Sequence, residues 1–207
     1  MLFAVRTEAS AFLSVASDKP RPPVLFTGMG ARNAHRALEH YVSNHPQPSW
    51  IISSGFAGGL NPDLVRGSVL FETDKDFPHL QRLDHASAIP GRFHTVDRVL
   101  ITAQEKAAVR EQTGADAVEM ESGAILRWSR QRGIPAAILR VISDAAADDL
   151  PLDFNRLMTP DLRISPLQLT KALVSSPARI LSLIQFQRQV QAASRQLSAV
   201  LWRTLNA

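Results

Sequence analysis

The sequence predicts an α/β fold: a single domain with a mixed, largely parallel central sheet flanked by helices, followed by a C-terminal helical extension. Short apolar segments alternate with helix-like segments over about the first 145 residues, which is typical of a sheet whose strands are connected by helices. Beyond Leu150 prolines become frequent, and a stretch without Gly or Pro follows at residues 179–205. We therefore expect an α/β domain over residues 1–150 and a helical extension over residues 151–207 that packs on it.

The strands of this sheet are expected where short apolar runs are bounded by glycine, proline or polar residues. The second run is expected to be a buried strand, and the last run is the strongest strand signal in the chain. In chain order the runs cover residues 2–5, 24–27, 50–54, 69–71, 96–101, 117–118 and 136–142.

Helices are expected between these runs, where apolar residues recur at helical spacing. The clearest one is followed by Gly133 and Pro135, which form a common stop signal. Residues 74–94 are polar and show no clean period, so we expect mostly loops there, as in the proline-rich stretch at residues 17–23. The predicted helices cover residues 8–15, 31–43, 105–111 and 122–132.

Composition excludes several classes of function. The 207 residues are 45% hydrophobic and 20% charged, as in ordinary globular proteins. The chain contains no cysteine, which excludes disulfides, thiol catalysis and cysteine-bound metals. It has no apolar run long enough to span a bilayer, and its first residues do not resemble a signal peptide. We therefore expect a cytoplasmic protein without a metal or an organic cofactor.

The net charge of +4 is concentrated in the tail. From Arg156 onward there are seven basic residues and one acidic residue, a charge of +6 that leaves −2 for the rest of the chain. Because the excess is local, nucleic-acid binding is not expected. On a helix over residues 179–205 one face is apolar and the opposite face carries three arginines. We expect the apolar face to pack on the core; the alternative is peripheral contact of this helix with a membrane or a partner. The apolar stripe is Leu183, Phe186, Val190, Ala193, Leu197, Leu201 and Leu205, and the arginines are Arg188, Arg195 and Arg203.

Two glycine-rich segments follow predicted strands. Gly28-Met29-Gly30 stands where a dinucleotide-binding motif would begin, but the third glycine and the distal acidic residue of that motif are absent. Its backbone N–H groups are suited to an anion or a sugar hydroxyl. Residues 54–60 contain three glycines without the Gly-Lys-Ser/Thr of a P-loop. A tight structural turn and a ligand site are equally good interpretations of this second segment, which contains Gly55, Phe56, Ala57 and Gly58.

Carboxylates stand where predicted strands end, which is where open α/β sheets bind ligands. Glu119-Met120-Glu121 lies at a strand-to-helix junction. A carboxylate there can accept hydrogen bonds from both hydroxyls of a vicinal diol, and the neighbouring methionine offers an adaptable apolar surface. The alternative is structural, because acidic residues also stabilise a helix N-terminus. Ser143-Asp144 ends the strongest strand, where an aspartate can also cap the next segment. Glu8 follows the first strand in the same way.

Taken together, these segments resemble the family of purine nucleoside phosphorylases and methylthioadenosine/adenosylhomocysteine nucleosidases over about residues 1–150. The resemblance implies a phosphorylase/hydrolase-like α/β fold and cleavage of the N-glycosidic bond of an adenosine-type purine nucleoside. Residues 159–166 and the basic tail are more similar to the hopanoid-associated phosphorylase subgroup, which implies a lipid-linked adenosyl substrate. The matching segments are Gly28–Ala34, Ser54–Leu60 with Gly67, Val118–Ser122 and Arg140–Asp144.

The resemblance also implies roles for individual residues. Asp144 is the expected general acid that protonates the purine at N7, and Ser143 is expected to hold its carboxyl group in place. Glu8 matches the glutamate that activates the attacking water in the nucleosidases. The ribose is expected to be held by Glu121, Met120 and Glu119, and the base or anion side by the backbone of Gly28, Gly30, Gly55, Phe56, Ala57 and Gly58.

Two departures from the phosphorylase pattern bear on the reaction. Ser53 and Phe56 stand where those enzymes commonly carry an arginine and a hydroxyl residue, so a phosphate dianion would lose a bidentate partner. Hydrolysis is therefore favoured, with phosphorolysis and phosphate as co-substrate the alternative. The family resemblance also implies a homo-oligomer. A contrasting hypothesis is a nucleoside-binding or membrane-associated scaffold of the same fold that has lost turnover.

Overall fold

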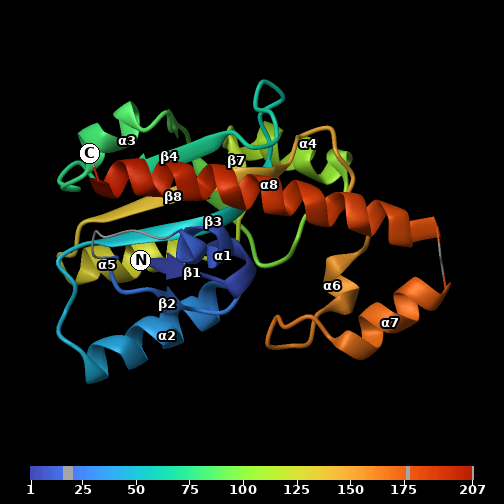
Figure 1. Cartoon of the computed structure of the whole chain (residues 1–207), viewed down its shortest axis with the longest axis horizontal. Helices are drawn as coiled ribbons and strands as arrows, with labels where there is room; N and C mark the ends of the chain where they lie inside the picture. The colour runs from blue at the N-terminus through green and yellow to red at the C-terminus, as the bar shows by residue number, and fades with distance from the viewer. Residues whose placement is uncertain (16–20, 176–177, 207) are drawn as a thin grey trace.

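The computed structural model of the protein describes residues 1–15, 21–175 and 178–206. Its strands are β1 (Leu2–Phe3), β2 (Leu25–Phe26), β3 (Ile51–Gly59), β4 (Val69–Thr73), β5 (Ile89–Pro90), β6 (Phe93–Thr95), β7 (Ala117–Glu119) and β8 (Ala136–Asp144). Its helices are α1 (Arg6–Ser14), α2 (Ala31–Asn44), α3 (Leu80–His85), α4 (Ala103–Thr113), α5 (Ser122–Gln131), α6 (Phe154–Leu157), α7 (Pro166–Ser175) and α8 (Ala178–Asn206) (Figure 1).

A mixed, largely parallel sheet forms the centre of the described molecule, as the sequence predicted. Its strands follow the order β2-β1-β3-β8-β4-β5, with β7 joined to β3 and β6 joined to β7. The central pair β3 and β8 is parallel over nearly its whole length, and β1 runs parallel to β3. Strands β4 and β7 pair antiparallel with β8 and β3 respectively. Because β1, β3 and β8 run in the same direction, their carboxyl ends meet at one edge of the sheet.

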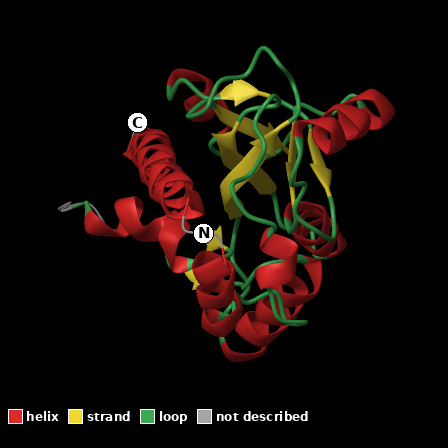
Figure 2. Cartoon of the chain, turned by 90° about the vertical axis from the view of Figure 1, so that its right-hand side faces the viewer, coloured by secondary structure: helices red, strands yellow, loops and turns green. Residues whose placement is uncertain are grey.

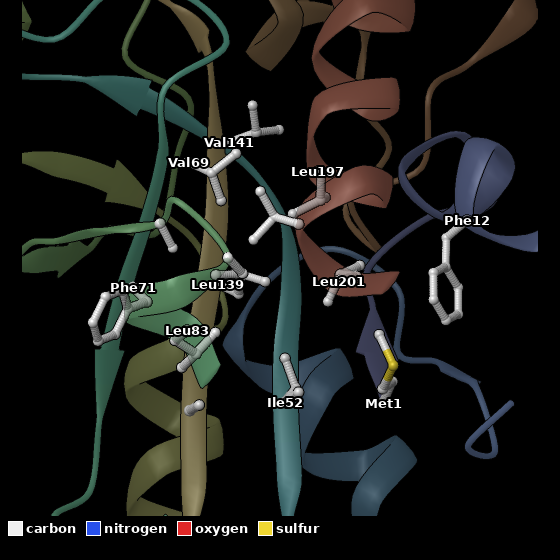
Figure 3. Close-up of a cluster of buried hydrophobic side chains, with 14 of the residues drawn as sticks. Met1, Phe12, Ile52, Val69, Phe71, Leu83, Leu139, Val141, Leu197 and Leu201 are labelled. Carbon is white, nitrogen blue, oxygen red and sulfur yellow. The ribbon is translucent and has the colours of Figure 1, made fainter. Parts of the chain in front are cut away.

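Helices cover both faces of this sheet (Figures 1 and 2). Helices α1, α3 and α8 lie on one face, where Ala137, Leu139 and Val141 of β8 pack against Leu197 and Leu201 of α8. Figure 3 shows Leu139 and Val141 on the strand side and Leu197 and Leu201 on the helix side of this cluster. Helices α2 and α5 cover the other face with a second apolar cluster. The alternation of side chains along β8 therefore places Arg140 on the face of α2 and α5.

The C-terminal extension has two different parts. The second half of α8 is in the core: Ala193, Leu197, Val200 and Leu201 are buried, and the ring of Trp202 packs at a tilt against Phe12 of α1. The first half projects beyond the sheet beside α6 and α7 (Figure 1). The predicted apolar stripe is therefore confirmed in the second half, and the three arginines of the opposite face are exposed. The domain boundary at residue 150 stays a prediction.

Apolar side chains are also exposed at the outer end of this extension. They belong to α7, to the first half of α8 and to the chain before α7, and they are Ile164, Leu167, Ile180, Leu181 and Ile184. Among the described residues, no helix is both long and apolar enough to cross a membrane. Contact of the extension with a membrane surface stays a prediction.

Four local predictions are corrected. Residues 96–101 are not a strand, and the neighbouring strand β6 lies just before them. The stretch 74–94 contains α3 and β5 as well as loops. Strand β2 is half-buried because it is the edge strand next to β1. Residues 54–59 continue β3 and do not form a turn. The predicted loop at residues 17–23 lies partly outside the described residues.

Candidate active site

The predicted acidic residues come together in a cavity of about 280 Å³ at the edge of the sheet where β1, β3 and β8 end. Glu8 reaches it from α1, Glu121 from the start of α5, and Ser143 and Asp144 from the end of β8. The other predicted residues that line it are Glu119, Met120, Phe56, Ala57 and Gly58. The structure thus collects side chains that are more than a hundred positions apart in the chain.

Glu8 is held rigidly inside this cavity. Its Oε2 accepts hydrogen bonds from the backbone N–H groups of Ala4 (2.8 Å) and Val5 (3.1 Å), and its Oε1 accepts one from Phe56 (2.9 Å). Burial raises the pKa of Glu8, while Arg140 and these three N–H groups act in the opposite direction. A buried carboxylate with a raised pKa is a stronger base than a solvated one, so this group is suited to accept a proton from water.

Gly55 makes room for the contact between Glu8 and its surroundings. A Cβ atom at this position would overlap Glu8 Oε1 and Arg140 Nη1. The glycine is therefore required by close approach of two charged side chains, and the segment that contains it is an extended strand. Any larger residue would displace Glu8 or Arg140.

Arg140 is a buried residue at the centre of the site for which the sequence predicted no role. Its Nη2 lies 3.0 Å from Glu119 Oε2 and 3.3 Å from Glu121 Oε2, and it also contacts the hydroxyls of Ser53 and Ser122. Burial acts to lower its pKa, but the surrounding carboxylates outweigh burial and raise it. The sequence did contain a signal, because Arg140 is the charged residue within the otherwise apolar run 136–142.

Glu119 and Glu121 have different surroundings. Glu119 Oε2 accepts the backbone N–H groups of Glu121 (2.8 Å) and Ser122 (2.6 Å), and its Oε1 accepts the Thr95 hydroxyl (2.5 Å). It thereby caps the start of α5. Glu121 Oε1 accepts only the Gly30 N–H among the hydrogen bonds of the described residues (2.8 Å), and its Oε2 contacts Arg140. Glu121 thus has more free acceptor capacity for a ligand hydroxyl.

The pKa of Glu121 is also raised. Burial raises its pKa from 4.5 to about 7; the charges of Glu119 and Glu8 add to this, while Arg140 and the Gly30 N–H act against it. The main cause is burial in a region with little solvent, and repulsion from the two neighbouring carboxylates adds to it.

This raised pKa predicts how stability depends on pH. Between pH 4.5 and about 7 the folded protein holds a proton on Glu121 that the unfolded chain has released, so the free energy of unfolding falls as pH rises through this window. The fall attributable to Glu121 is roughly 3 kcal/mol. In the Glu121→Gln variant this part of the slope is expected to disappear, whereas exposed Glu111→Gln keeps it. Denaturant unfolding at several pH values measures the difference, and parallel curves for wild type and Glu121→Gln would contradict the assignment.

Asp144 is bound on both of its oxygens. The hydroxyl of Ser143 donates to Oδ1 (2.6 Å), and the ammonium of Lys106 lies 2.5 Å from Oδ2. Lys106 is a second residue for which the sequence predicted no role, and nothing in its sequence context distinguishes it from an exposed lysine of a helix. Gly58 lies beside this pair, since a Cβ there would approach within 3.3 Å of Asp144 Oδ2.

Backbone N–H groups of the two glycine-rich segments near the cavity form hydrogen bonds within the protein. Gly28 N–H donates to the Ala4 carbonyl (3.0 Å), Gly30 N–H to Glu121, and Phe56 N–H to Glu8. Gly28 and Gly30 have positive φ angles of 78° and 86°, so the chain turns there in a conformation that favours glycine. Three of the backbone donors predicted to face the base or an anion therefore hold the carboxylates of Glu8 and Glu121 or tie the strands together.

The C-terminal extension supplies an apolar wall of the cavity that the sequence did not predict. Helix α6 is connected to α8 by the contact of Phe154 and Phe186, whose ring centroids are 5.7 Å apart. The residues of this wall are Leu150, Phe154, Met158, Ile164, Phe186 and Val190. Over the described part of the chain, no group of three or more His, Asp or Glu side chains is arranged to hold a metal ion.

Comparison with known proteins is consistent with this arrangement. Residues 75–175 match the phosphorylase superfamily. Over 170 residues, which are 65% of this chain and 72% of the other, the sequence is 26% identical to a 5′-methylthioadenosine/S-adenosylhomocysteine nucleosidase of Geobacillus kaustophilus. It is 25% identical over 148 residues to an aminodeoxyfutalosine nucleosidase of Campylobacter jejuni. That alignment spans 56% of this chain and 64% of the Campylobacter protein, less than two thirds of its length.

The fold is similar to that of solved nucleosidases. The 5′-methylthioadenosine/S-adenosylhomocysteine nucleosidase of S. pneumoniae, solved with the transition-state inhibitor MT-ImmA, superimposes with a TM-score of 0.70. The superposition covers 100% of this chain and 97% of the other at 16% sequence identity. This likeness shows the fold, and it includes the helical region after residue 150.

Proposed function

Since its sequence matches the phosphorylase superfamily at low identity and its fold is that of the nucleosidases, we propose that this chain cleaves the N-glycosidic bond of an adenosine-type purine nucleoside by hydrolysis. The observation that carries the proposal is the meeting of Glu8, Glu121 and Asp144 in one cavity at the carboxyl ends of the central strands. A base, a ligand for the sugar and an acid are the groups that such a reaction needs.

Each acid has a role that fits its environment. Glu8 takes a proton from the water that attacks the anomeric carbon, and the charge of Glu8 stabilises the positive character that develops on the ribose. Glu121 accepts hydrogen bonds from the 2′- and 3′-hydroxyls, and Met120 packs on the sugar. Asp144, oriented by Ser143, delivers a proton to N7 so that the purine leaves as a neutral base. Arg140 keeps the carboxylate cluster together.

Hydrolysis fits the charges around Glu8 better than phosphorolysis. Of the described residues that line the cavity, Arg98 carries a positive charge, and it pairs with Glu105 at 2.7 Å. Arg140 is committed to Glu119 and Glu121, and Arg6 lies over the ring of Phe26. A phosphate dianion would therefore enter a region of several carboxylates whose neighbouring N–H donors are already bonded, which is electrostatically unfavourable.

An assay of products tests this proposal directly. The full chain is incubated with adenosine and with 5′-methylthioadenosine, with and without inorganic phosphate. We expect release of the purine and the free sugar at the same rate in both buffers, because water is the nucleophile. A sugar 1-phosphate that forms only with phosphate would favour the alternative, phosphorolysis. Release of no purine from either nucleoside would contradict the enzyme and favour an inactive nucleoside-binding scaffold.

The apolar wall of the cavity supports a more specific proposal about the substrate. Phe154, Met158 and Phe186 line the cavity from the extension, which suits an apolar group on the nucleoside. The lipid-linked adenosyl substrate and the hopanoid-associated subgroup are proposals that rest on the resemblance of residues 159–166 and the tail. A homo-oligomer and a location in the cytoplasm likewise stay predictions.

A further inference from the structure

Lys106 is a fully buried cation that the reaction as described so far does not use. It is 0% exposed and is the buried residue of α4, whose other side chains are at least partly accessible. Burying an ammonium group removes its hydration, and proteins tolerate this only where the charge is paired and fully hydrogen-bonded. An apolar residue would fill the same space without that cost, so the charge calls for an explanation.

The contacts of Lys106 account for all three of its N–H donors. Nζ lies 2.5 Å from Asp144 Oδ2 and donates to the backbone carbonyls of Ala145 (2.8 Å) and Asp148 (2.9 Å). The ammonium is thereby aimed at one oxygen of Asp144, while Ser143 holds the other oxygen at 2.6 Å. The carboxyl group is fixed in its plane by two partners from two elements, α4 and β8.

The pairing raises a chemical question about Asp144. A neighbouring ammonium favours the ionised carboxylate, yet a general acid must have a proton to give. The same geometry offers an answer. If Nζ loses the proton that faces Asp144, its two remaining N–H groups keep their carbonyl acceptors, and the neutral amine stays hydrogen-bonded. Gly58, which lines the cavity, leaves open space beside Oδ2.

We propose that Lys106 is a positioning residue that acts through Asp144 by holding its carboxyl group in place and storing the proton that Asp144 passes to the departing base. This inference rests on the proposed nucleosidase reaction. The bond from the anomeric carbon to N9 breaks and its electron pair goes to the purine. A proton moves from Nζ to Asp144 Oδ2 and from Asp144 to N7, while Glu8 accepts a proton from the attacking water. After product release, exchange with solvent moves the proton from Glu8 back to Lys106.

Other charged groups surround the pair, among them Arg98, which lines the cavity and pairs with Glu105 of α4. Across the cavity lie Glu8, Glu119 and Glu121 with Arg140. In the loop after β8, Asp148 pairs with Arg66 and accepts the Ala145 N–H, and the charge of Lys106 also acts on its carboxylate. The ammonium that contacts Asp144 directly is that of Lys106.

The test is the pH profile of the full chain and of the Lys106→Met variant on an adenosine-type nucleoside, with exposed Lys75→Met as the matched control. In wild type Lys106 supplies the proton that Asp144 passes on. Without Lys106 the proton must sit on Asp144 itself, so the alkaline limb of kcat is expected to move to lower pH. The expected loss is about a hundredfold at alkaline pH, with at most about tenfold at mildly acidic pH, and KM changes little. A uniform loss at all pH values, or a limb that stays in place or moves to higher pH, would overturn the proposal.

A second measurement does not depend on turnover. Infrared spectra of protein carrying isotope-labelled aspartate follow the Asp144 carboxyl, which is assigned by its loss in Asp144→Asn. We expect Asp144 to become protonated at higher pH in Lys106→Met than in wild type; identical titrations would contradict the pairing. If Lys106→Met does not fold, Lys106→Gln is measured in the same way. Absence of cleavage by wild type would contradict the proposed function, whereas an active wild type with unaltered variant profiles would contradict the role of Lys106 alone.

Discussion

The Asp144→Asn variant is expected to cleave its nucleoside with a kcat at least about a hundredfold below that of wild type, because an amide cannot supply a proton to the leaving purine. The loss should fall on kcat, because in the proposed reaction Asp144 acts on the base as the glycosidic bond breaks, whereas the proposed sugar contacts of Glu121 are untouched. The fold should survive. The amide oxygen of the new side chain can still accept from Lys106, and the Ser143 hydroxyl can still donate to the Ala57 carbonyl, 3.3 Å away.

Steady-state kinetics on the same nucleoside, with thermal unfolding of each variant, checks this expectation. Asp63→Asn is the matched control, because Asp63 is exposed and lies outside the cavity. It should keep the rate of wild type. A folded Asp144→Asn variant that retains wild-type turnover would remove the general acid from the mechanism.

The Glu8→Gln variant is expected to lose about a hundredfold or more of kcat, because glutamine cannot take a proton from the attacking water. It also removes the negative charge that faces the developing positive charge on the ribose. This variant should lose stability as well. Glu8 accepts three backbone N–H groups with its two oxygens, and the amide nitrogen of glutamine cannot accept, so at least one buried donor loses its partner. The expected cost is about 1–3 kcal/mol.

Turnover and the free energy of unfolding should therefore be measured together, at a temperature where every variant is folded. Glu111→Gln, on the exposed surface of α4, provides the control for loss of one carboxylate. If Glu8→Gln is destabilised as expected but turns over at the wild-type rate, Glu8 is a structural residue and another base activates the water.

The outline of the fold could be predicted from local patterns. The strands β4 and β8 and the helices α2, α4 and α5 were all expected within a few residues of their observed positions, whereas β3 was expected to end at Ser54 and continues to Gly59. The failure at residues 96–101 has a clear physical cause. The backbone N–H and carbonyl of Val99 bond to the side chain of Asn155, and Ile101 N–H bonds to Glu105, so this apolar segment is satisfied without a strand partner. Its apolar side chains pack in a small cluster with Val118 instead.

In the glycine-rich segment 54–60, the glycines have a different structural role from the one expected. Local chemistry suited a tight turn and a ligand site equally well, but β3 continues through the segment because β8 and β7 provide partners on either side. Its glycines are needed where charged side chains approach the strand: Glu8 and Arg140 at Gly55, and Asp144 at Gly58. The close approach follows from packing of α1 and β8 on this strand, which no local pattern encodes.

From the sequence alone it followed that an α/β sheet would present Glu8, Glu121 and Asp144 near the ends of its strands, because strand periodicity and the position of a polar residue after an apolar run are local properties. The partners of these acids were decided by tertiary structure. Arg140 faces Glu119 and Glu121 because β7 and β8 lie on either side of β3. Lys106 faces Asp144 because its side chain reaches from α4 to the end of β8. Each of these pairs joins residues that are distant in the chain. Their formation, and the electrostatic environment that they give the acids, therefore depends on how the elements pack.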